Sequence, residues 1–212
     1  MEKMQDTLSK VGEWSASNKY LVAIKNAFEK YMPLIIIGAI AVLWTNVIVN
    51  DQTGLGALWK PIMNLSFLNP AFNAINFCTM GIIALGITFL VGYELAKNYK
   101  FSPSFCGFLS VVAWVSMLNT TQTIVNVEKE TVSVSGLFSG VLGTDGLFTG
   151  MIIAIVTVEL FRALYSIDWL KIKLPDQVPE GVARSFEYLL PAFVLLLITS
   201  MLSLVIQNVS GG

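Results

Sequence analysis

Long apolar stretches separated by short polar segments dominate the sequence after residue 31. Four of them approach the roughly 20 residues that a helix needs to cross a bilayer core of about 30 Å. These four stretches are Met32–Val49, Ile75–Ala96, Gly146–Tyr165 and Phe186–Ile206. A fifth, Pro103–Leu118, is shorter, so by length alone it fits either a re-entrant segment or a span. The pattern predicts an all-α membrane protein.

The placement of lysine and arginine decides how Pro103–Leu118 is interpreted, because cytoplasmic loops are enriched in both residues. If all five stretches span and the N-terminus is inside, only Lys60 and Lys129 of the 13 basic residues lie outside. If Pro103–Leu118 does not span, the basic residues between positions 171 and 184 also move outside. The sequence therefore predicts about five transmembrane helices with a cytoplasmic N-terminus.

The N-terminal segment carries a different pattern. Leu21, Ile24, Phe28 and Tyr31 recur at helical spacing with lysines between them, which is typical of an amphipathic helix lying in the inner membrane interface. The predicted domains are therefore a cytoplasmic or interfacial helical segment at residues 1–31 and a five-span transmembrane domain at residues 32–212.

The segment between the third and fourth predicted spans is the only strand-like part of the sequence. β-Branched runs at Thr123–Val127 and Thr131–Val134 flank the polar Glu128-Lys129-Glu130, which predicts a small β-hairpin in an outer loop.

A glycine pattern occurs twice after this hairpin, at Gly136–Gly140 and at Gly146–Gly150. Small residues four positions apart let two membrane helices approach closely. For the first copy, glycines that break a loop are an equally good interpretation. For the second copy, which lies inside a predicted span, helix packing is favoured.

Charged residues inside the predicted spans are few, and they occur in two pairs near the inner ends. Glu94 lies three residues before Lys97, and Glu159 lies three residues before Arg162. Residues at this spacing share one helix face, so each pair can form an ion pair. The structural interpretation, in which the charges neutralise each other at the interface, is favoured over a coupling or gating role.

Composition excludes several classes of function. The chain is 55% hydrophobic and 13% charged, and it contains no histidine. Serine or cysteine nucleophiles paired with histidine and the usual zinc sites are thus excluded. A nucleotide-binding G-x-x-x-x-G-K loop is absent, and no basic run exists to bind nucleic acid. The sequence predicts no metal and no cofactor.

Three stretches together resemble one family. They are Tyr20–Phe28 continuing through Met32–Gly38, then Leu142–Phe148 followed by Val158–Arg162, and finally Ile172–Phe186 closing on Leu190–Phe193. In this order they are similar to the N-terminal half of the membrane (IIC) subunits of the sugar phosphotransferase system, lactose/cellobiose/diacetylchitobiose type.

The resemblance implies a sugar permease in the bacterial plasma membrane that works as a homodimer. Such subunits bind a β-linked disaccharide, carry it inward and present it to a soluble phosphorylated IIB protein, which is supplied by IIA. The chain would belong to a transferase complex without being catalytic itself. Members of the family are longer, and their sugar-binding residues are expected downstream of this chain. What remains would supply scaffold and dimer contacts, with Lys171, Lys173 and Arg184 on a cytoplasmic loop where the soluble partner docks.

Two other hypotheses are compatible with the same spans. The chain could be a free-standing membrane scaffold or regulatory protein derived from such a permease. A small self-contained channel is disfavoured, because it needs a polar stripe through the spans and the sequence offers only Asn46, Thr88 and scattered serines.

Overall fold

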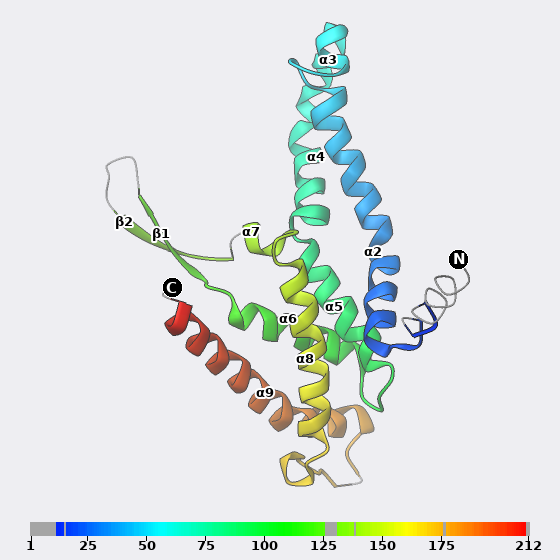
Figure 1. Ribbon diagram of the computed structural model, residues 1–212, viewed down its shortest axis with the longest axis vertical. Helices are drawn as coiled ribbons and strands as arrows, with labels where there is room; N and C mark the ends of the chain where they lie inside the picture. The colour runs from blue at the N-terminus through cyan, green and yellow to red at the C-terminus, as the bar shows by residue number, and fades with distance from the viewer. Residues whose placement is uncertain (1–11, 15, 126–130, 138, 176, 211–212) are drawn as a thin grey trace, which may run out of the picture.

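The computed structural model describes residues 12–14, 16–125, 131–137, 139–175 and 177–210, and helices dominate it (Figure 1). The main helices are α2 (Lys19–Leu43), α4 (Asn69–Asn76), α5 (Ile83–Ala96), α6 (Pro103–Met117), α8 (Leu147–Tyr165) and α9 (Glu180–Ser210). Shorter elements join them: a π turn at Trp44–Ile48, α3 (Leu55–Leu58), a 3-10 helix at Lys60–Leu68, a π turn at Phe77–Gly81, α7 (Ser139–Leu142) and a 3-10 turn at Asp168–Leu170.

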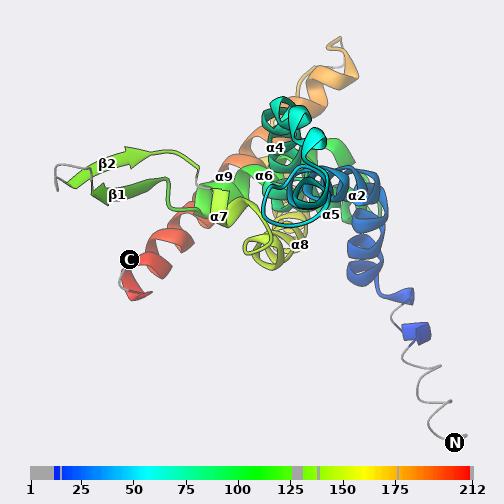
Figure 2. The same ribbon diagram turned by 90° about the horizontal axis from the view of Figure 1, so that it is seen from above.

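The bundle is built around α5, which packs against α2, α6 and α8 (Figures 1 and 2). Ile87, Val91 and Leu95 of α5 are fully buried in these contacts, and Trp114 of α6 and Phe161 of α8 are the largest fully buried side chains. α9 lies across α6 and α8 and completes this part of the fold. Burial of these side chains is the main structural reason why the helices stay together.

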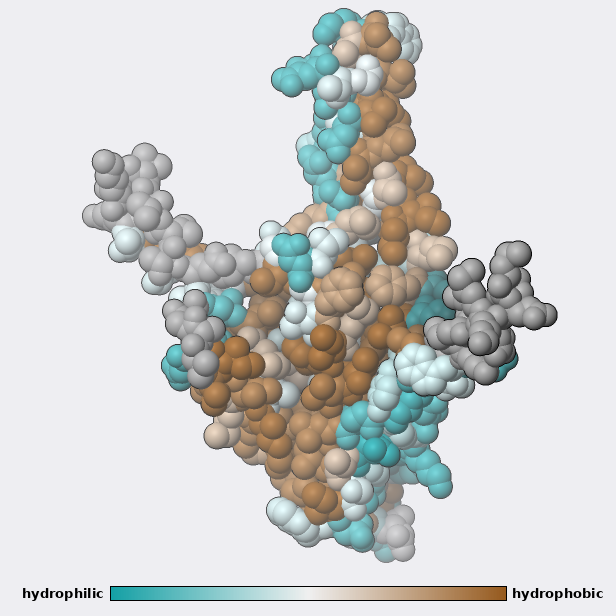
Figure 3. Space-filling view, in the orientation of Figure 1, coloured by the Kyte–Doolittle hydropathy of each residue, from teal (hydrophilic) through white to brown (hydrophobic). Residues whose placement is uncertain are grey.

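An arm projects from this bundle. It consists of the C-terminal half of α2, α3 at the tip and the returning segment 60–76, which includes α4 (Figure 1). Trp44 holds its two sides together, because its ring stacks on Phe72 at 4.5 Å and its indole N–H donates to Asn69 Oδ1 at 3.2 Å. The outer face of α2 in the arm is apolar, with Ile36 and Ile40 more than half exposed (Figure 3).

The helix α2 does not stop at the predicted boundary between residues 31 and 32. It runs from Lys19 to Leu43 as one helix, so the expected interfacial segment and the first predicted span are continuous. The Asn18 side chain caps its start by accepting from the Tyr20 and Leu21 amides. Tyr31 is buried against Gly86, and nothing at this point ends the helix. An interfacial position for its first half stays a prediction.

The second predicted span, Ile75–Ala96, is broken in the structure, so a crossing at this segment stays a prediction. α4 ends at Asn76, a π turn follows, and α5 begins at Ile83 after a bend of 40°. Ile82 leaves the helical region with φ −123° and ψ 24°. The Tyr31 hydroxyl donates to the Thr79 carbonyl at 2.9 Å, which satisfies a backbone group at the break.

The number of spans is only partly determined by helix length. In the described part of the chain, three helices are long and apolar enough to cross a membrane: Lys19–Ile48, Leu147–Tyr165 and Glu180–Asn208. Counting the bent pair 60–96 as one span gives up to four. The helix α6 is apolar but has only 15 residues, so a fifth span at Pro103–Leu118 stays a prediction.

The two strands β1 (Thr121–Val125) and β2 (Thr131–Ser135) pair antiparallel, with Thr123 opposite Ser133. They extend away from the helices (Figure 1). The predicted turn residues Glu128-Lys129-Glu130 lie outside the described residues.

The two copies of the glycine pattern have different surroundings. A Cβ atom added at Gly136 or Gly140 would meet nothing within 4 Å. A Cβ added at Gly150 would lie 2.2 Å from Thr88 Oγ1, because α8 approaches α5 at this point. The second copy is therefore a helix-packing site, as the sequence favoured, and the first copy makes no such contact.

Candidate functional site

Two buried or partly buried carboxylates gather basic side chains at the ends of α5 and α8 that lie away from α7 (Figure 1). We call them the Glu94 cluster and the Glu159 cluster. Both contain the pair expected along one helix: Lys97 Nζ lies 2.8 Å from Glu94 Oε1, and Arg162 Nε lies 3.0 Å from Glu159 Oε2.

The Glu94 cluster joins α2 to α5. The Glu94 side chain is only 4% exposed, and it pairs with Lys30 of α2 as well as with Lys97. Both ammonium groups also lie over the Tyr93 ring, at 5.1 Å and 4.8 Å from its centroid. Two cations therefore share one buried anion, and an aromatic face contributes to their stabilisation.

The Glu159 cluster joins α2 to α8. Lys19 Nζ lies 2.8 Å from Glu159 Oε1, and the hydroxyls of Tyr20 and Tyr99 donate to the same oxygen at 3.1 Å and 2.5 Å. The ammonium of Lys19 also donates to the Tyr99 hydroxyl at 2.7 Å. Burial, and then the hydrogen bond to Glu159, raises the pKa of the Tyr99 phenol, so it stays protonated and can act as a donor.

The sequence missed the contributions of Lys19 and Lys30 to these clusters. They are separated from their carboxylates by 140 and 64 positions, so no local spacing connects them. The sequence offers one indication of these clusters, namely the distribution of basic residues. It predicts that Lys19, Lys30, Lys97 and Arg162 lie on the same side of the membrane. The basic face of α2 therefore packs against carboxylates of the bundle.

An aromatic cluster lies next to the Glu159 cluster and holds the start of α9. Phe161 contacts the Tyr165 and Tyr188 rings at 5.8 Å and 5.5 Å. The Tyr188 hydroxyl accepts from the Ser102 amide at 3.0 Å, and the Tyr165 hydroxyl donates to Glu187 Oε2 at 2.6 Å. These contacts position the segment that follows the basic loop.

The three basic residues expected on a docking loop have different environments. Lys173 is exposed and has no partner in the described part of the chain. Lys171 is 19% exposed, lies 3.2 Å from Asp168 Oδ1 and sits 4.6 Å from the Tyr165 ring centroid. Arg184 is in the first turns of α9 and not in a loop, and it pairs with Glu180 four residues earlier. Of these three residues, only Lys173 presents a cation without a partner among the described residues.

Among the described residues, no group of three or more cysteine, aspartate or glutamate side chains could hold a metal ion. Both side-chain oxygens of Glu94 and of Glu159 have lysine, arginine or tyrosine partners. The arrangement fixes helices relative to one another, which supports the structural interpretation of the ion pairs.

The comparisons with known proteins give a consistent result. The family profile described as "Phosphotransferase system, EIIC" matches residues 25–212. The oligo-beta-mannoside-specific EIIC component of Bacillus subtilis (strain 168) is 32% identical over 208 residues, which are 97% of this chain and 44% of that protein. The cellobiose-specific EIIC component of Geobacillus stearothermophilus is 32% identical over 210 residues, covering 96% of this chain and 45% of that protein.

A solved structure is also similar. The crystal structure of ChbC, the IIC component of the N,N'-diacetylchitobiose-specific phosphotransferase system, matches 96% of this chain and 46% of its own with a TM-score of 0.83 and 27% identity. The chain thus spans slightly less than half the length of each of these three relatives.

Proposed function

Because the chain belongs to the phosphotransferase system EIIC family, we propose that it forms part of a sugar permease that takes up a β-linked disaccharide and presents it for phosphorylation. This proposal rests on the match of the family profile to residues 25–212, together with the structural similarity to ChbC over 96% of the chain. Cellobiose, lactose or diacetylchitobiose are the substrates we propose, since relatives are named for them.

Within such a permease, we propose that this chain supplies scaffold and dimer contacts while the transport site for the sugar lies downstream. Glu159 and Glu94, near the ends of α8 and α5, already form ion pairs with lysines of α2. We therefore do not assign these carboxylates to sugar binding. The apolar outer face of the arm supports a homodimer, because large exposed apolar surfaces of membrane helices are covered by lipid or by another subunit.

Native mass spectrometry of the protein in lipid nanodiscs tests the dimer. We expect a protein mass near twice 23.2 kDa. A mass near 23.2 kDa in bilayers of every composition would contradict the dimer. Uptake tests the permease: in cells lacking their own cellobiose permease, we expect phosphoenolpyruvate-dependent accumulation of cellobiose phosphate when this chain is co-expressed with the second half of the cellobiose-specific relative of Geobacillus stearothermophilus. Accumulation of unphosphorylated sugar, or no uptake, would contradict it.

The proposed soluble partner is a IIB protein supplied by IIA. In support, the lactose-specific relatives of Staphylococcus aureus and Lacticaseibacillus casei are named EIICB components, so their names join the C and B components. A free-standing scaffold or regulatory protein is less well supported, because the relatives are named as components of permeases.

Charge reversal at Lys173 tests the docking surface. We expect Lys173→Glu to weaken binding of a purified IIB protein to the nanodisc-embedded chain by about tenfold, mainly through the association rate, because an exposed unpaired cation steers an acidic partner. Arg184→Glu should have a smaller effect, since Arg184 is already paired with Glu180. Biolayer interferometry gives both rates. Lys60→Glu, an exposed lysine predicted on the opposite side, is the matched control, and equal effects at Lys60 and Lys173 would contradict the proposed topology.

A further inference from the structure

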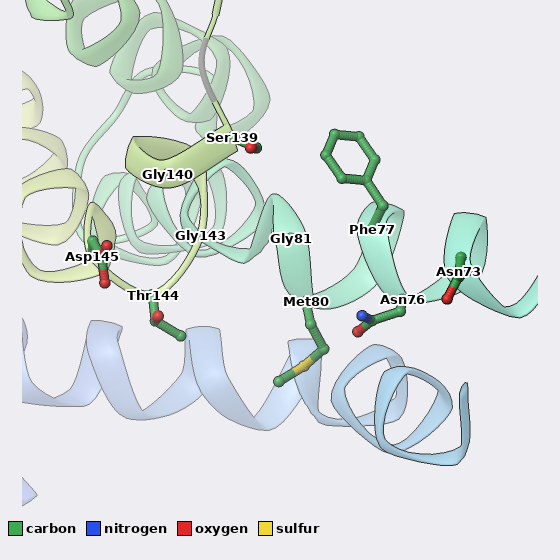
Figure 4. A pocket seen from close by; sticks show the side chains of 10 residues that line it. All are labelled: Asn73, Asn76, Phe77, Met80, Gly81, Ser139, Gly140, Gly143, Thr144 and Asp145. Atoms are coloured by element: carbon green, nitrogen blue, oxygen red, sulfur yellow. The ribbon is translucent and has the colours of Figure 1, made fainter. Parts of the chain in front are cut away.

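A groove of about 580 Å³ lies between the π turn at Phe77–Gly81 and the segment Ser139–Asp145 (Figure 4). Its volume is within the range of small-molecule sites. One wall comes from the end of α4 and the π turn, and the other from α7 and the loop before α8. π turns inside helices are frequent at functional sites. The groove is at the end of the bundle opposite the two charged clusters (Figure 1).

The walls of the groove combine polar side chains with Phe77, Met80 and three glycines. Five of its side chains have no hydrogen-bond or ion-pair partner in the described part of the chain: Asn73, Asn76, Ser139, Thr144 and Asp145. In Figure 4 the Asn76 side chain points toward Met80, and the Phe77 ring is turned toward Ser139. Phe77 is 52% exposed, so its ring is accessible from the groove.

Three glycines, Gly81, Gly140 and Gly143, line the groove. A Cβ added at Gly143 would lie 3.4 Å from the Gly81 carbonyl oxygen, so the two walls approach closely at this point. A Cβ added at Gly140 would meet nothing, so the space beside this residue is empty. Larger residues at these positions would narrow or fill the groove.

The groove does not suit contact with hydrocarbon, because unpaired amide, hydroxyl and carboxylate groups are costly to bury in lipid. Its single carboxylate and the absence of lysine or arginine from its lining disfavour an anion. One carboxylate with neutral neighbours is also a poor site for a multivalent cation. Amides and hydroxyls both donate and accept hydrogen bonds, so they match a ligand that also does both.

We propose that this groove binds a neutral, hydroxyl-rich saccharide, and that it is a contact site separate from the transport site expected downstream. The hydroxyls of the saccharide would form hydrogen bonds with Asn73, Asn76 and Asp145. An apolar C–H face of the sugar would pack on the electron-rich face of the Phe77 ring. Only the ligand class rests on the proposed function; the groove and its unpaired polar groups stand on the structure. We expect weak binding, because four of the polar lining residues, Asn73, Ser139, Thr144 and Asp145, are exposed.

Saturation-transfer NMR with cellobiose and the nanodisc-embedded chain tests this site. We expect transfer to the sugar from the parent protein. Gly140→Leu should fill the groove and lower the signal about threefold to tenfold, the equivalent of about one or two lost hydrogen bonds. Asp145→Asn should lower it less, because an amide keeps one acceptor oxygen. Gly136→Leu is the matched control, since a Cβ there also meets nothing and Gly136 is outside the groove.

Each outcome decides the proposal. Loss of signal in Gly140→Leu with an unchanged melting temperature and an unaffected Gly136→Leu supports it. No transfer from the parent protein, or transfer that Gly140→Leu retains, overturns it. The uptake experiment is independent of this result: cellobiose bound in the groove without uptake would contradict the permease alone, and uptake without binding in the groove would contradict the groove alone.

Discussion

Replacing Gly150 with leucine is expected to prevent the bundle from folding, whereas the same replacement at Gly140 leaves its stability unchanged. A Cβ at position 150 would lie 2.2 Å from Thr88 Oγ1, and Thr88 is fully buried in α5. Neither helix can move aside without opening the contact between α5 and α8, which is among the most extensive in the fold. Overpacking typically costs about 1–3 kcal/mol and occasionally more, which is a large part of the stability of a small domain.

Circular dichroism melting in detergent and size-exclusion chromatography provide the measurement. We expect Gly150→Leu to aggregate or to melt far below the parent protein, and Gly150→Ala to lie between the two. Gly140→Leu is the matched control from the other copy of the glycine pattern. Similar melting temperatures for Gly150→Leu and Gly140→Leu would show that α8 does not approach α5 as the structure has it.

Neutralising Glu94 is expected to have the second largest effect. Glu94→Gln leaves Lys30 and Lys97 next to each other without their shared anion, and the remaining amide is buried. Removing one partner from a fully buried ion pair costs 3–5 kcal/mol. Because the two lysine side chains are 45% and 42% exposed, solvent screens part of this cost. We therefore expect a loss of about 2 kcal/mol, with α2 released from α5.

Chemical unfolding of the protein in mixed micelles measures this loss. Glu29→Gln is the matched control, because Glu29 is on α2, more than half exposed, and paired only with Lys25. Its effect should stay within about 0.5 kcal/mol. A double-mutant cycle with Lys30→Met isolates the contact between α2 and α5. If Glu94→Gln and Glu29→Gln were equally mild, the Glu94 cluster would not fix α2 to the bundle.

The sequence by itself determined the properties that depend on local pattern. Apolar length predicted helices at Pro103–Leu118 and Gly146–Tyr165, and the structure has them at Pro103–Met117 and Leu147–Tyr165. Spacing of three residues placed Lys97 beside Glu94. These outcomes follow from the rise and periodicity of a single helix, which the order of residues encodes directly.

Helix ends and the break were harder to predict. The loop containing Arg184 is instead the first part of α9, and the span Ile75–Ala96 is divided by a π turn. An apolar run shows how much chain is buried, but it does not show where the backbone leaves the helical region. That choice depends on contacts such as the one from Tyr31 to the Thr79 carbonyl, 48 positions away.

Only the tertiary structure decided which distant groups meet. Lys19 pairs with Glu159 across 140 positions, and the groove joins the end of α4 to the loop before α8. The sequence predicts that most basic residues lie on one side of the membrane, but it does not identify their partners, because several carboxylates and lysines are compatible with the same topology. The packing of α2 against α5 and α8 determines which lysine pairs with which carboxylate, since it fixes which charges lie within a few ångströms of each other.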